Sequence, residues 1–434
     1  MARIHMIHAR EVLDSRGNPT LEVGVFLENG AQGVAMVPSG ASTGKHEAVE
    51  LRDEASGRYL GKGVQKAIRN VEWEIAPAVA RMEALDQGRI DETLIRLDGT
   101  GNKRRLGANA ILGVSMAVAR AAAASAGLPL YRYLGGAAAR ELPVPIVNIL
   151  SGGIHGGGNI DFQDFMMIPL RASRYSEALE DVAAVHSSMK AVLKSRGAHR
   201  AGVADEGGYA PVLPSNEAGF EVMAEAMVKA GLQPGKDAAI AVDVAASHFY
   251  RQGRYVLSVE DQELSARRMV EALAGYVDRH PVLAIEDGLS EEDWAGWKSL
   301  TERLGERCLL IGDDLFVTHQ ERLEKGIEAG IANAVLVKVN QVGTVTETLD
   351  VVRRARRSGY QAVISARSGE TEDDFIADLA VAAGAPMIKI GAITRSERLA
   401  KYNRLKRIEE QLGSHARYHG GSEVFADFLE PKSN

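Results

Sequence analysis

Short apolar runs recur at near-even intervals between residues 240 and 391, and nearly every run stops on a charged residue. Segments with helical period lie between the runs. A buried strand followed by a helix, repeated in series, indicates a parallel sheet, and at least six such units predict a closed (β/α) barrel. The six runs are residues 240–243, 282–287, 309–314, 334–339, 362–365 and 387–390.

Charged side chains at the ends of these runs predict a single site. In a parallel barrel, the carboxyl ends of the strands face one shared mouth. Residues far apart in the sequence would therefore meet there. Three carboxylates suit a hard cation such as Mg²⁺, and two lysines beside them suit an anionic substrate and a proton transfer. The residues expected to converge are Asp243, Glu286, Asp313, Lys338 and Lys389.

The first part of the chain has a different pattern. Residues 4–35 alternate strand-like runs with turn signals, which predicts an antiparallel meander. Residues 64–126 then follow a helical pattern. Strands followed by helices predict a separate, smaller α+β domain. We place the boundary so that residues 1–139 form this α+β domain and residues 140–434 form the barrel domain.

Length and composition limit the class of protein. The 434 residues exceed one ordinary core and fit a barrel of about 250 residues plus a smaller domain. The net charge of −7 is spread without long charged blocks, so no nucleic-acid footprint is visible. The single cysteine, Cys308, excludes an intrachain disulfide framework and indicates a reducing compartment. Residues 1–6 lack the regions of a secretory signal, so we expect a cytoplasmic protein.

The most apolar helix candidate covers residues 108–126. It is rich in alanine and carries Arg120, which favours a buried helix of a globular domain over a membrane span. Gly127 can adopt the left-handed conformation that ends a helix, and Pro129 prevents continuation.

Two loops contain many small residues. Residues 37–44 combine glycines with hydroxyl side chains, which fits a flap over a polar ligand and fits a surface turn about equally well. Residues 151–159 form a glycine-rich loop that holds His155, and a lone loop histidine is more often simply solvated.

Each candidate residue also has a simpler explanation. Glu206 could belong to a polar turn at residues 205–208, Asp313 could cap a helix, and Lys338 could extend into solvent. The recurrence of charge at the same place in successive units favours a site. A buried strand end tolerates charge only where the charge is paired or bound to metal.

Five long motifs are spread over nearly the whole chain. They are Asp-Ser-Arg-Gly-Asn-Pro at 14–19, Ser-Gly-Ala-Ser-Thr-Gly at 39–44, Gly-Ala-Asn-Ala-Ile-Leu at 107–112, Asp-Glu-Gly-Gly-Tyr at 205–209 and Ser-Gly-Glu-Thr-Glu-Asp at 368–373. These motifs resemble those of the enolase family. The resemblance implies an α/β fold, an enolase-type (β/α)8 barrel with one irregular, antiparallel start, preceded by a smaller α+β N-terminal domain. It also implies a homodimer and two Mg²⁺ ions.

The resemblance also assigns metal ligands. Asp243, Glu286 and Asp313 correspond to the ligands of the first Mg²⁺. Ser42 corresponds to the flap serine that joins the second ion with the substrate phosphate. Such ions would stabilise the negative charge that develops on the substrate after proton removal.

The proton-transfer residues follow from the same resemblance. Lys338 corresponds to the base that removes the proton α to the substrate carboxylate, and Glu206 to the acid that protonates the leaving C3 hydroxyl. We expect Lys389 and the cations to lower the pKa of Lys338 by like-charge repulsion, which frees its amine. The expected substrate contacts are Arg367 and Ser368 at the phosphate, His155 on the flap side, Gln163 beside the metal, and Lys389 and Ser42.

Two positions depart from the family pattern. Ala366 stands where the family has a histidine, and Asp164 stands at a catalytic position where the family has a glutamate. In the family both lie beside the leaving hydroxyl and assist the general acid. Both replacements shorten a side chain, so we expect added space and fewer proton-handling groups on this side alone. Smaller departures are Ile154, residues 156–158 and Ile390.

The retained positions favour a specialised enolase-like enzyme that acts on 2-phosphoglycerate or a close analogue. One relative of this kind is the carboxyphosphonoenolpyruvate synthase of phosphonate antibiotic pathways, which uses 2-phosphoglycerate and a nucleotide-activated phosphonoformate. An ordinary glycolytic enolase is a further alternative. A non-catalytic scaffold would have no reason to keep Lys338, Glu206 and the three metal carboxylates.

Overall fold

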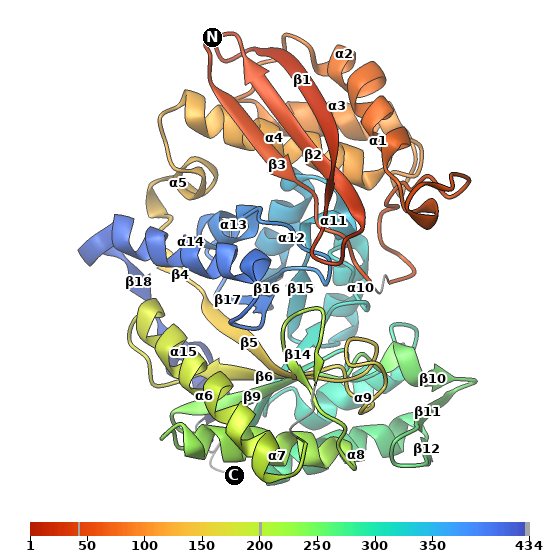
Figure 1. The fold of residues 1–434 in the computed structure, drawn as a ribbon, viewed down its shortest axis with the longest axis vertical. Coiled ribbons are helices and arrows are strands. Elements are labelled where there is room, and N and C mark those ends of the chain that lie inside the picture. The colour runs from red at the N-terminus through yellow and green to blue at the C-terminus, as the bar shows by residue number, and fades with distance from the viewer. Residues whose placement is uncertain (42–43, 199–201, 430–434) are drawn as a thin grey trace.

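A computed structural model describes residues 1–41, 44–198 and 202–429 of the chain. An N-terminal part with three strands and several helices lies at the top of Figure 1, and a larger barrel with its surrounding helices lies below it. This arrangement confirms the predicted fold class.

The N-terminal strands form the predicted antiparallel meander. Strand β1 (Ile4–Leu13) pairs with β2 (Pro19–Leu27), which pairs with β3 (Gln32–Met36). Alternate residues of β2 are buried because one face of the sheet packs on helix α4 (Ala108–Ser125). A Cβ atom on Gly33 would lie 2.3 Å from the backbone of Ala117, so the close approach of sheet and helix requires glycine here.

Helix α4 is the core helix of this part. It is long and apolar enough to pass a simple test for a membrane span, but 83% of it is buried inside the protein. Gly127 follows it with a φ of +65°, as the sequence predicted. The remaining helices of this part are α1 (Gln65–Asn70), α2 (Ala76–Val79), α3 (Gln87–Asp98) and α5 (Leu130–Gly135), with short helical turns at Arg58–Gly61, Val71–Ile75 and Gly136–Ala138.

Eight strands form the closed barrel. Seven run parallel, and β6 runs antiparallel to both of its neighbours, which is the irregular start that the resemblance implies. The last strand pairs with the first and closes the sheet. In spatial order the strands are β5 (Val144–Ser151), β6 (Asp164–Pro169), β9 (Ala238–Asp243), β13 (Val282–Glu286), β14 (Leu309–Gly312), β15 (Ala334–Val337), β16 (Gln361–Ser365) and β17 (Met387–Gly391).

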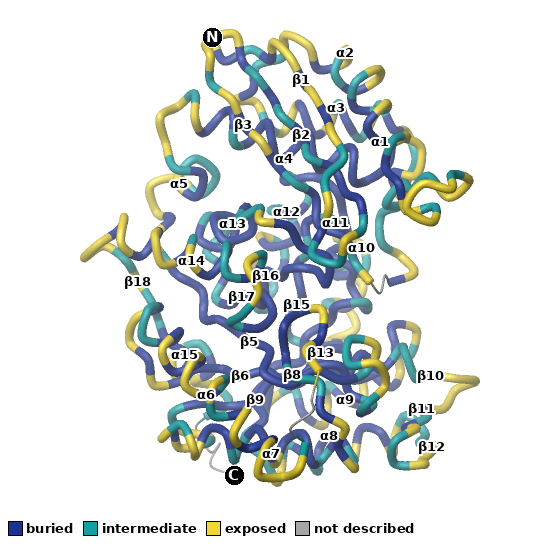
Figure 2. The backbone as a smooth tube through the Cα atoms, in the orientation of Figure 1, coloured by how far each residue is buried: buried dark blue, intermediate teal, exposed yellow. Residues whose placement is uncertain are grey.

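Amphipathic helices surround the barrel, so the strands are buried on both faces and appear dark in Figure 2. The helices are α6 (Tyr175–Ser195), α7 (Asn216–Lys229), α8 (Ala266–Arg279), α9 (Trp294–Leu304), α10 (Gln320–Ala329), α11 (Val339–Val342), α12 (Val345–Arg357), α13 (Phe375–Ala383), α14 (Ser396–Leu412), α15 (Gly420–Val424) and α16 (Ala426–Leu429). Short elements are β4 (Glu141–Leu142), β7 (Gly202–Val203), β8 (Tyr209–Ala210), β10 (Tyr250–Arg251), β11 (Arg254–Leu257), β12 (Gln262–Leu264), β18 (Arg417–Tyr418) and helical turns at Ala246–Phe249 and Gly413–His415.

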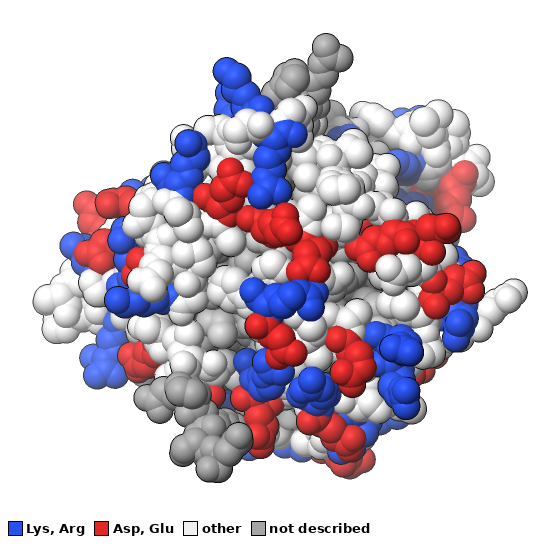
Figure 3. Space-filling model, turned by 90° about the horizontal axis from the view of Figure 1, so that it is seen from below, with Lys and Arg blue, Asp and Glu red and all other residues white. Residues whose placement is uncertain are grey.

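Positive and negative side chains are interspersed on the face seen from below in Figure 3. Ion pairs join neighbouring elements around the barrel: Arg279 of α8 pairs with Glu217 of α7, and Arg196, just after α6, pairs with Glu221 of α7. The expectation that the chain binds no nucleic acid stays a prediction.

The amino end of the barrel is closed by the C-terminal segment. Phe425 is fully buried in the apolar cluster of the barrel interior, and the amide of Ser422 donates to the carbonyl of Leu170 just beyond β6. We therefore expect Phe425→Ala to lower the free energy of unfolding by about 3–5 kcal/mol, measured by urea denaturation. Val228→Ala, at a side chain that is 63% exposed, is the control and should have little effect. Equal losses in both variants would contradict a packed barrel floor.

The N-terminal part covers the carboxyl end of the barrel. Ser39 and Gly369 exchange two backbone hydrogen bonds, and the amide of Ala48 donates to the carbonyl of Gln341. The loop after β3 is thus held against the strand ends. The domain boundary near residue 140 falls between α5 and β4 and stays a prediction.

Candidate active site

The charged residues that follow the apolar runs do converge. Asp243 and Glu286 end β9 and β13, Asp313 and Lys338 directly follow β14 and β15, and Lys389 lies within β17. They meet because all of these strands are parallel and close one barrel.

Lys389 binds two of the carboxylates. Its Nζ lies 3.0 Å from Asp243 Oδ2 and 2.8 Å from each carboxylate oxygen of Glu286. Burial lowers the pKa of Lys389, but Asp243 and Glu286 outweigh burial and hold the pKa well above its usual value. Burial and the charge of Asp243 raise the pKa of Glu286 well above its usual range. Negative charge is therefore in excess at this point.

Lys338 is the direct ion-pair partner of Asp313. Burial, Arg367 and Lys389 all lower the pKa of Lys338, yet Asp313 and Glu286 outweigh them, so the pKa is raised. Among the protein's own groups the balance therefore raises the pKa of Lys338, and the expected lowering, which also invoked the charge of bound cations, stays a prediction. Repulsion by Lys389 is present, but the contact with a carboxylate is closer and dominates.

A second layer fixes the position of Asp313. Gln341 donates to its Oδ1 at 2.9 Å, and the carboxylate of Asp287 accepts from the amides of Asp313 and Asp314 at 2.9 and 2.8 Å. Sequence reasoning missed Asp287 and Gln341. The doublet Glu286-Asp287 could have indicated this role. Successive residues at a strand end point in opposite directions, so when Glu286 faces the mouth, the carboxylate of Asp287 needs hydrogen-bond donors elsewhere.

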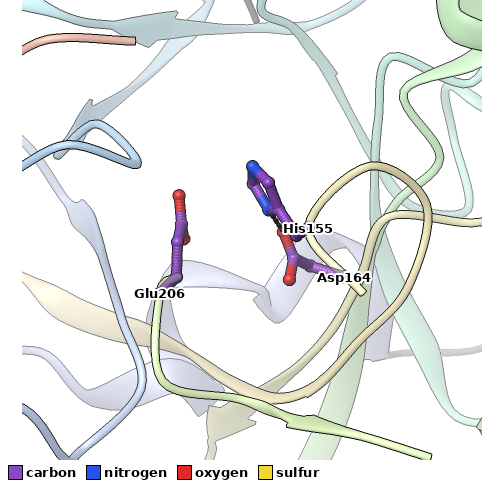
Figure 4. A group of neighbouring side chains, drawn as sticks. All are labelled: His155, Asp164 and Glu206. Carbon is purple, nitrogen blue, oxygen red and sulfur yellow. Dashed lines mark hydrogen bonds and ion pairs between the residues drawn. The ribbon is translucent and has the colours of Figure 1, made fainter. Parts of the chain in front are cut away.

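The opposite side of the mouth carries His155, Asp164 and Glu206, which point toward a common space in Figure 4. One ligand atom from each lies within 4.8 Å of the others. His155 Nδ1 is 3.1 Å from Asp164 Oδ2, and Asn148 Nδ2 donates to Glu206 Oε2 at 3.1 Å. The loop histidine is therefore not merely solvated.

The pKa values of this group differ from their usual values. Burial lowers the pKa of His155, but Asp164, Glu206 and Asp243 raise it to about 9. Burial raises the pKa of Glu206, but His155 and nearby cations hold it below its usual value. The proton of this group therefore rests on the imidazole at neutral pH.

Arg367 and Ser368 contact the loop that comes from the N-terminal part. The guanidinium of Arg367 lies 2.9 and 3.2 Å from the two oxygens of Glu47 and donates to Asn340 Oδ1 at 2.9 Å. The hydroxyl of Ser368 accepts from the amide of Ala41 at 2.7 Å. Glu47 was also missed, since a carboxylate just after a glycine-rich loop gives no sign of its distant partner.

The charged residues at the strand ends and the group around His155 and Glu206 line one small cavity of about 30 Å³. A cavity of this size holds about one water molecule. The expectation that Ala366 and Asp164 add space relative to the family stays a prediction. Ser42 lies outside the described residues. The cavity is lined by His155, Gln163, Glu206, Asp243, Asp313, Lys338, Ser365, Ala366, Arg367, Ser368 and Lys389.

The donor set fits a hard divalent cation. Asp243, Glu286 and Asp313 supply carboxylate oxygens, which are the ligands that Mg²⁺ prefers. Gln163 donates to Asp243 at 3.2 Å, and its own Oε1 is buried without a hydrogen-bond partner among the described residues. Excess negative charge and an unused oxygen are both features that a bound cation would satisfy.

Family models match both parts of the chain. The model described as the enolase C-terminal TIM barrel domain matches residues 139–426. The model described as the enolase N-terminal domain matches residues 4–134.

Proposed function

The chain belongs to the enolase family and is an enzyme of that superfamily, and from this premise we propose that it removes the C2 proton of 2-phosphoglycerate, or of a close analogue, and forms an enolpyruvate phosphoester. One observation carries the proposal. The amino group of Lys338, the carboxylate of Glu206 and the guanidinium of Arg367 line the same cavity. That set can take up a proton, assist a leaving group and bind a phosphate.

Each residue has a role in this proposal. Lys338 accepts the C2 proton as the free amine, a form that would be favoured once a bound cation replaced Lys338 as the partner of Asp313. Lys389 offsets negative charge on the substrate carboxylate. Arg367 and Ser368 bind the phosphate after exchanging their contacts with Glu47 and Ala41. Glu206 passes to the leaving C3 hydroxyl the proton that otherwise rests on His155, with Asp164 beside them.

Asp243, Glu286 and Asp313 would hold Mg²⁺, with Gln163 as their neighbour and Ser42 toward a second ion. A bound cation would offset the charge that develops on the substrate carboxylate. The lysines that pair with these carboxylates would then turn to the substrate.

Removal of Mg²⁺ should destabilise the protein. A cation that binds only the folded state adds about 2.7 kcal/mol when its concentration is 100 times its dissociation constant. We expect EDTA to lower the melting temperature, and added Mg²⁺ to restore it, in a scanning fluorimetry titration. Glu286→Gln should reduce the difference in melting temperature between protein with EDTA and protein with Mg²⁺. A melting temperature that ignores both EDTA and Mg²⁺ would show that the metal site is wrongly assigned.

We propose a specialised paralogue, since Ala366 places a methyl group on the cavity wall beside the leaving-group residues. The alternatives are carboxyphosphonoenolpyruvate synthase and an ordinary glycolytic enolase. Both 2-phosphoglycerate alone and a two-substrate reaction require the loops over the mouth to move apart, because the cavity has only about 30 Å³. We also propose a cytoplasmic homodimer that binds a small phosphorylated anion, which size-exclusion chromatography with light scattering tests in part.

The alternatives differ in their turnover. The purified protein would be incubated with Mg²⁺ and 2-phosphoglycerate, with and without cytidylyl phosphonoformate, while enolpyruvate absorbance is followed. Turnover with 2-phosphoglycerate alone at ordinary enolase rates supports the glycolytic enzyme, and turnover only with both compounds supports the synthase. Binding of 2-phosphoglycerate without any reaction of either mixture supports a scaffold and contradicts the proposal.

A further inference from the structure

Ser151 and Asp164 form a buried hydrogen bond at the edge of the active site. Ser151 ends β5 and Asp164 begins β6, and the two are direct partners across the antiparallel pair. Ser151 Oγ lies 2.6 Å from Asp164 Oδ1, and both side chains are fully buried. Since a carboxylate only accepts hydrogen bonds, the hydroxyl of Ser151 is the donor.

The second oxygen of Asp164 is also engaged. Oδ2 binds Nδ1 of His155 at 3.1 Å. Nδ1 therefore carries a hydrogen, and Nε2 is left at the far end of the ring, directed away from Asp164 (Figure 4). Asp164 thus fixes the direction of the imidazole and keeps a hydrogen on Nδ1, and Ser151 fixes Asp164.

Ser151 also lies beneath the turn that carries Glu206. A Cβ atom on Gly208 would be 2.5 Å from Ser151 Oγ, so the turn packs directly over the hydroxyl. Asn159 donates to the carbonyls of both Ser151 and Pro211, which joins the His155 loop to the segment after Glu206. One serine therefore touches the supports of both side chains.

We propose that Ser151 is a positioning residue for the leaving-group side of the site. By holding Asp164, it directs the Nε2–H of His155 toward the space beside Glu206. Ala366 offers only a methyl group there, so the aligned imidazole supplies an N–H beside Glu206 in addition to that of Asn148. This inference rests on the proposed function. Ser151 compensates for the short carboxylate of Asp164 by holding it in place.

The local charges support this arrangement. Three carboxylates, Asp164, Glu206 and Asp243, together raise the pKa of His155 to about 9. The imidazole is then protonated at neutral pH and donates from both nitrogens.

The test separates two steps of the proposed reaction. In Ser151→Ala, we expect the rate of elimination from 2-phosphoglycerate to fall about tenfold or more. This loss is a modest part of the rate enhancement that an oriented acid contributes. Exchange of the C2 proton with solvent, measured by NMR in D₂O, should change less than about twofold, because it depends on Lys338. Ser151→Thr keeps the hydroxyl and should restore elimination.

A matched control exists elsewhere in the chain. Ser115 is also fully buried and donates to a buried aspartate, Asp91, at 2.7 Å, but it lies where α4 meets α12. Ser115→Ala therefore removes a similar hydrogen bond without touching the site. It should leave the ratio of elimination to exchange unchanged. An equal change in both serine variants, or no change in Ser151→Ala, would overturn the proposal.

A second readout does not depend on turnover. Side-chain ¹⁵N NMR should show Nδ1 of His155 protonated and slowly exchanging in the native protein, and rapidly exchanging in Ser151→Ala. Failure of the native protein to exchange the C2 proton would sink the proposed function only. Unchanged Nδ1–H exchange in Ser151→Ala would overturn the positioning role in either case.

Discussion

Lys338→Ala should lower the exchange of the C2 proton of 2-phosphoglycerate with solvent by roughly 10³-fold, whereas Glu206→Gln should leave exchange intact and block elimination. A positioned acid or base contributes about 10²–10⁴-fold. Lys338 follows β15 on the metal-ligand side of the cavity, and Glu206 comes from the turn before β8 on the opposite side. The two residues therefore act on different atoms of the substrate.

The measurement is deuterium incorporation at C2 in D₂O, followed alongside enolpyruvate absorbance. Lys298→Ala is the control, because this lysine binds the carbonyl of Ala329 outside the barrel. It should affect neither rate. Equal loss of exchange in Lys338→Ala and Glu206→Gln would contradict the assigned roles.

The double variant Ala366→His with Asp164→Glu should accelerate the dehydration of 2-phosphoglycerate by about 10²-fold. It restores an imidazole and a longer carboxylate beside the leaving hydroxyl. If the enzyme instead uses a second substrate, the same change should fill the space needed by that substrate and depress the two-substrate reaction. C2-proton exchange and Mg²⁺ binding should be spared in both cases.

Ala366→Val distinguishes the effect of filling the cavity from the effect of adding a proton-transfer group. It adds bulk on the cavity wall without an imidazole, so it should not accelerate dehydration, but it should depress a two-substrate reaction. A native enzyme as fast as a standard enolase, and indifferent to the double variant, would show that the two departures are neutral and that the ordinary glycolytic function is correct.

The barrel and the convergence of its charged residues could be predicted because both follow from local patterns. Each buried strand appears as an apolar run, and parallel strands place the residue after each run at one mouth. Asp243 and Glu286 therefore reach Lys389 although more than 100 residues separate them from it. The antiparallel β6 came only from the resemblance, since direction leaves no mark in a buried run.

Two side-chain contacts could not be predicted. The pair Glu47 with Arg367 depends on how the loop after β3 docks against the barrel. The pair Ser151 with Asp164 depends on the register of two antiparallel strands, which the apolar runs do not give. The contribution of Asp313 to the pKa of Lys338 could not be predicted for a related reason. The sign of the pKa shift depends on whether the nearest charge is Asp313 or Lys389, and a distance between two side chains is not contained in their positions along the chain.

Deuterium exchange at C2 of 2-phosphoglycerate by the native protein tests the central claim most directly. With Mg²⁺ in D₂O, we expect ¹H NMR to show loss of the C2 proton signal at a rate that exceeds the formation of enolpyruvate, and EDTA to stop the loss. A protein that binds 2-phosphoglycerate and Mg²⁺ but leaves the C2 proton in place would contradict the proposal that Lys338 removes this proton.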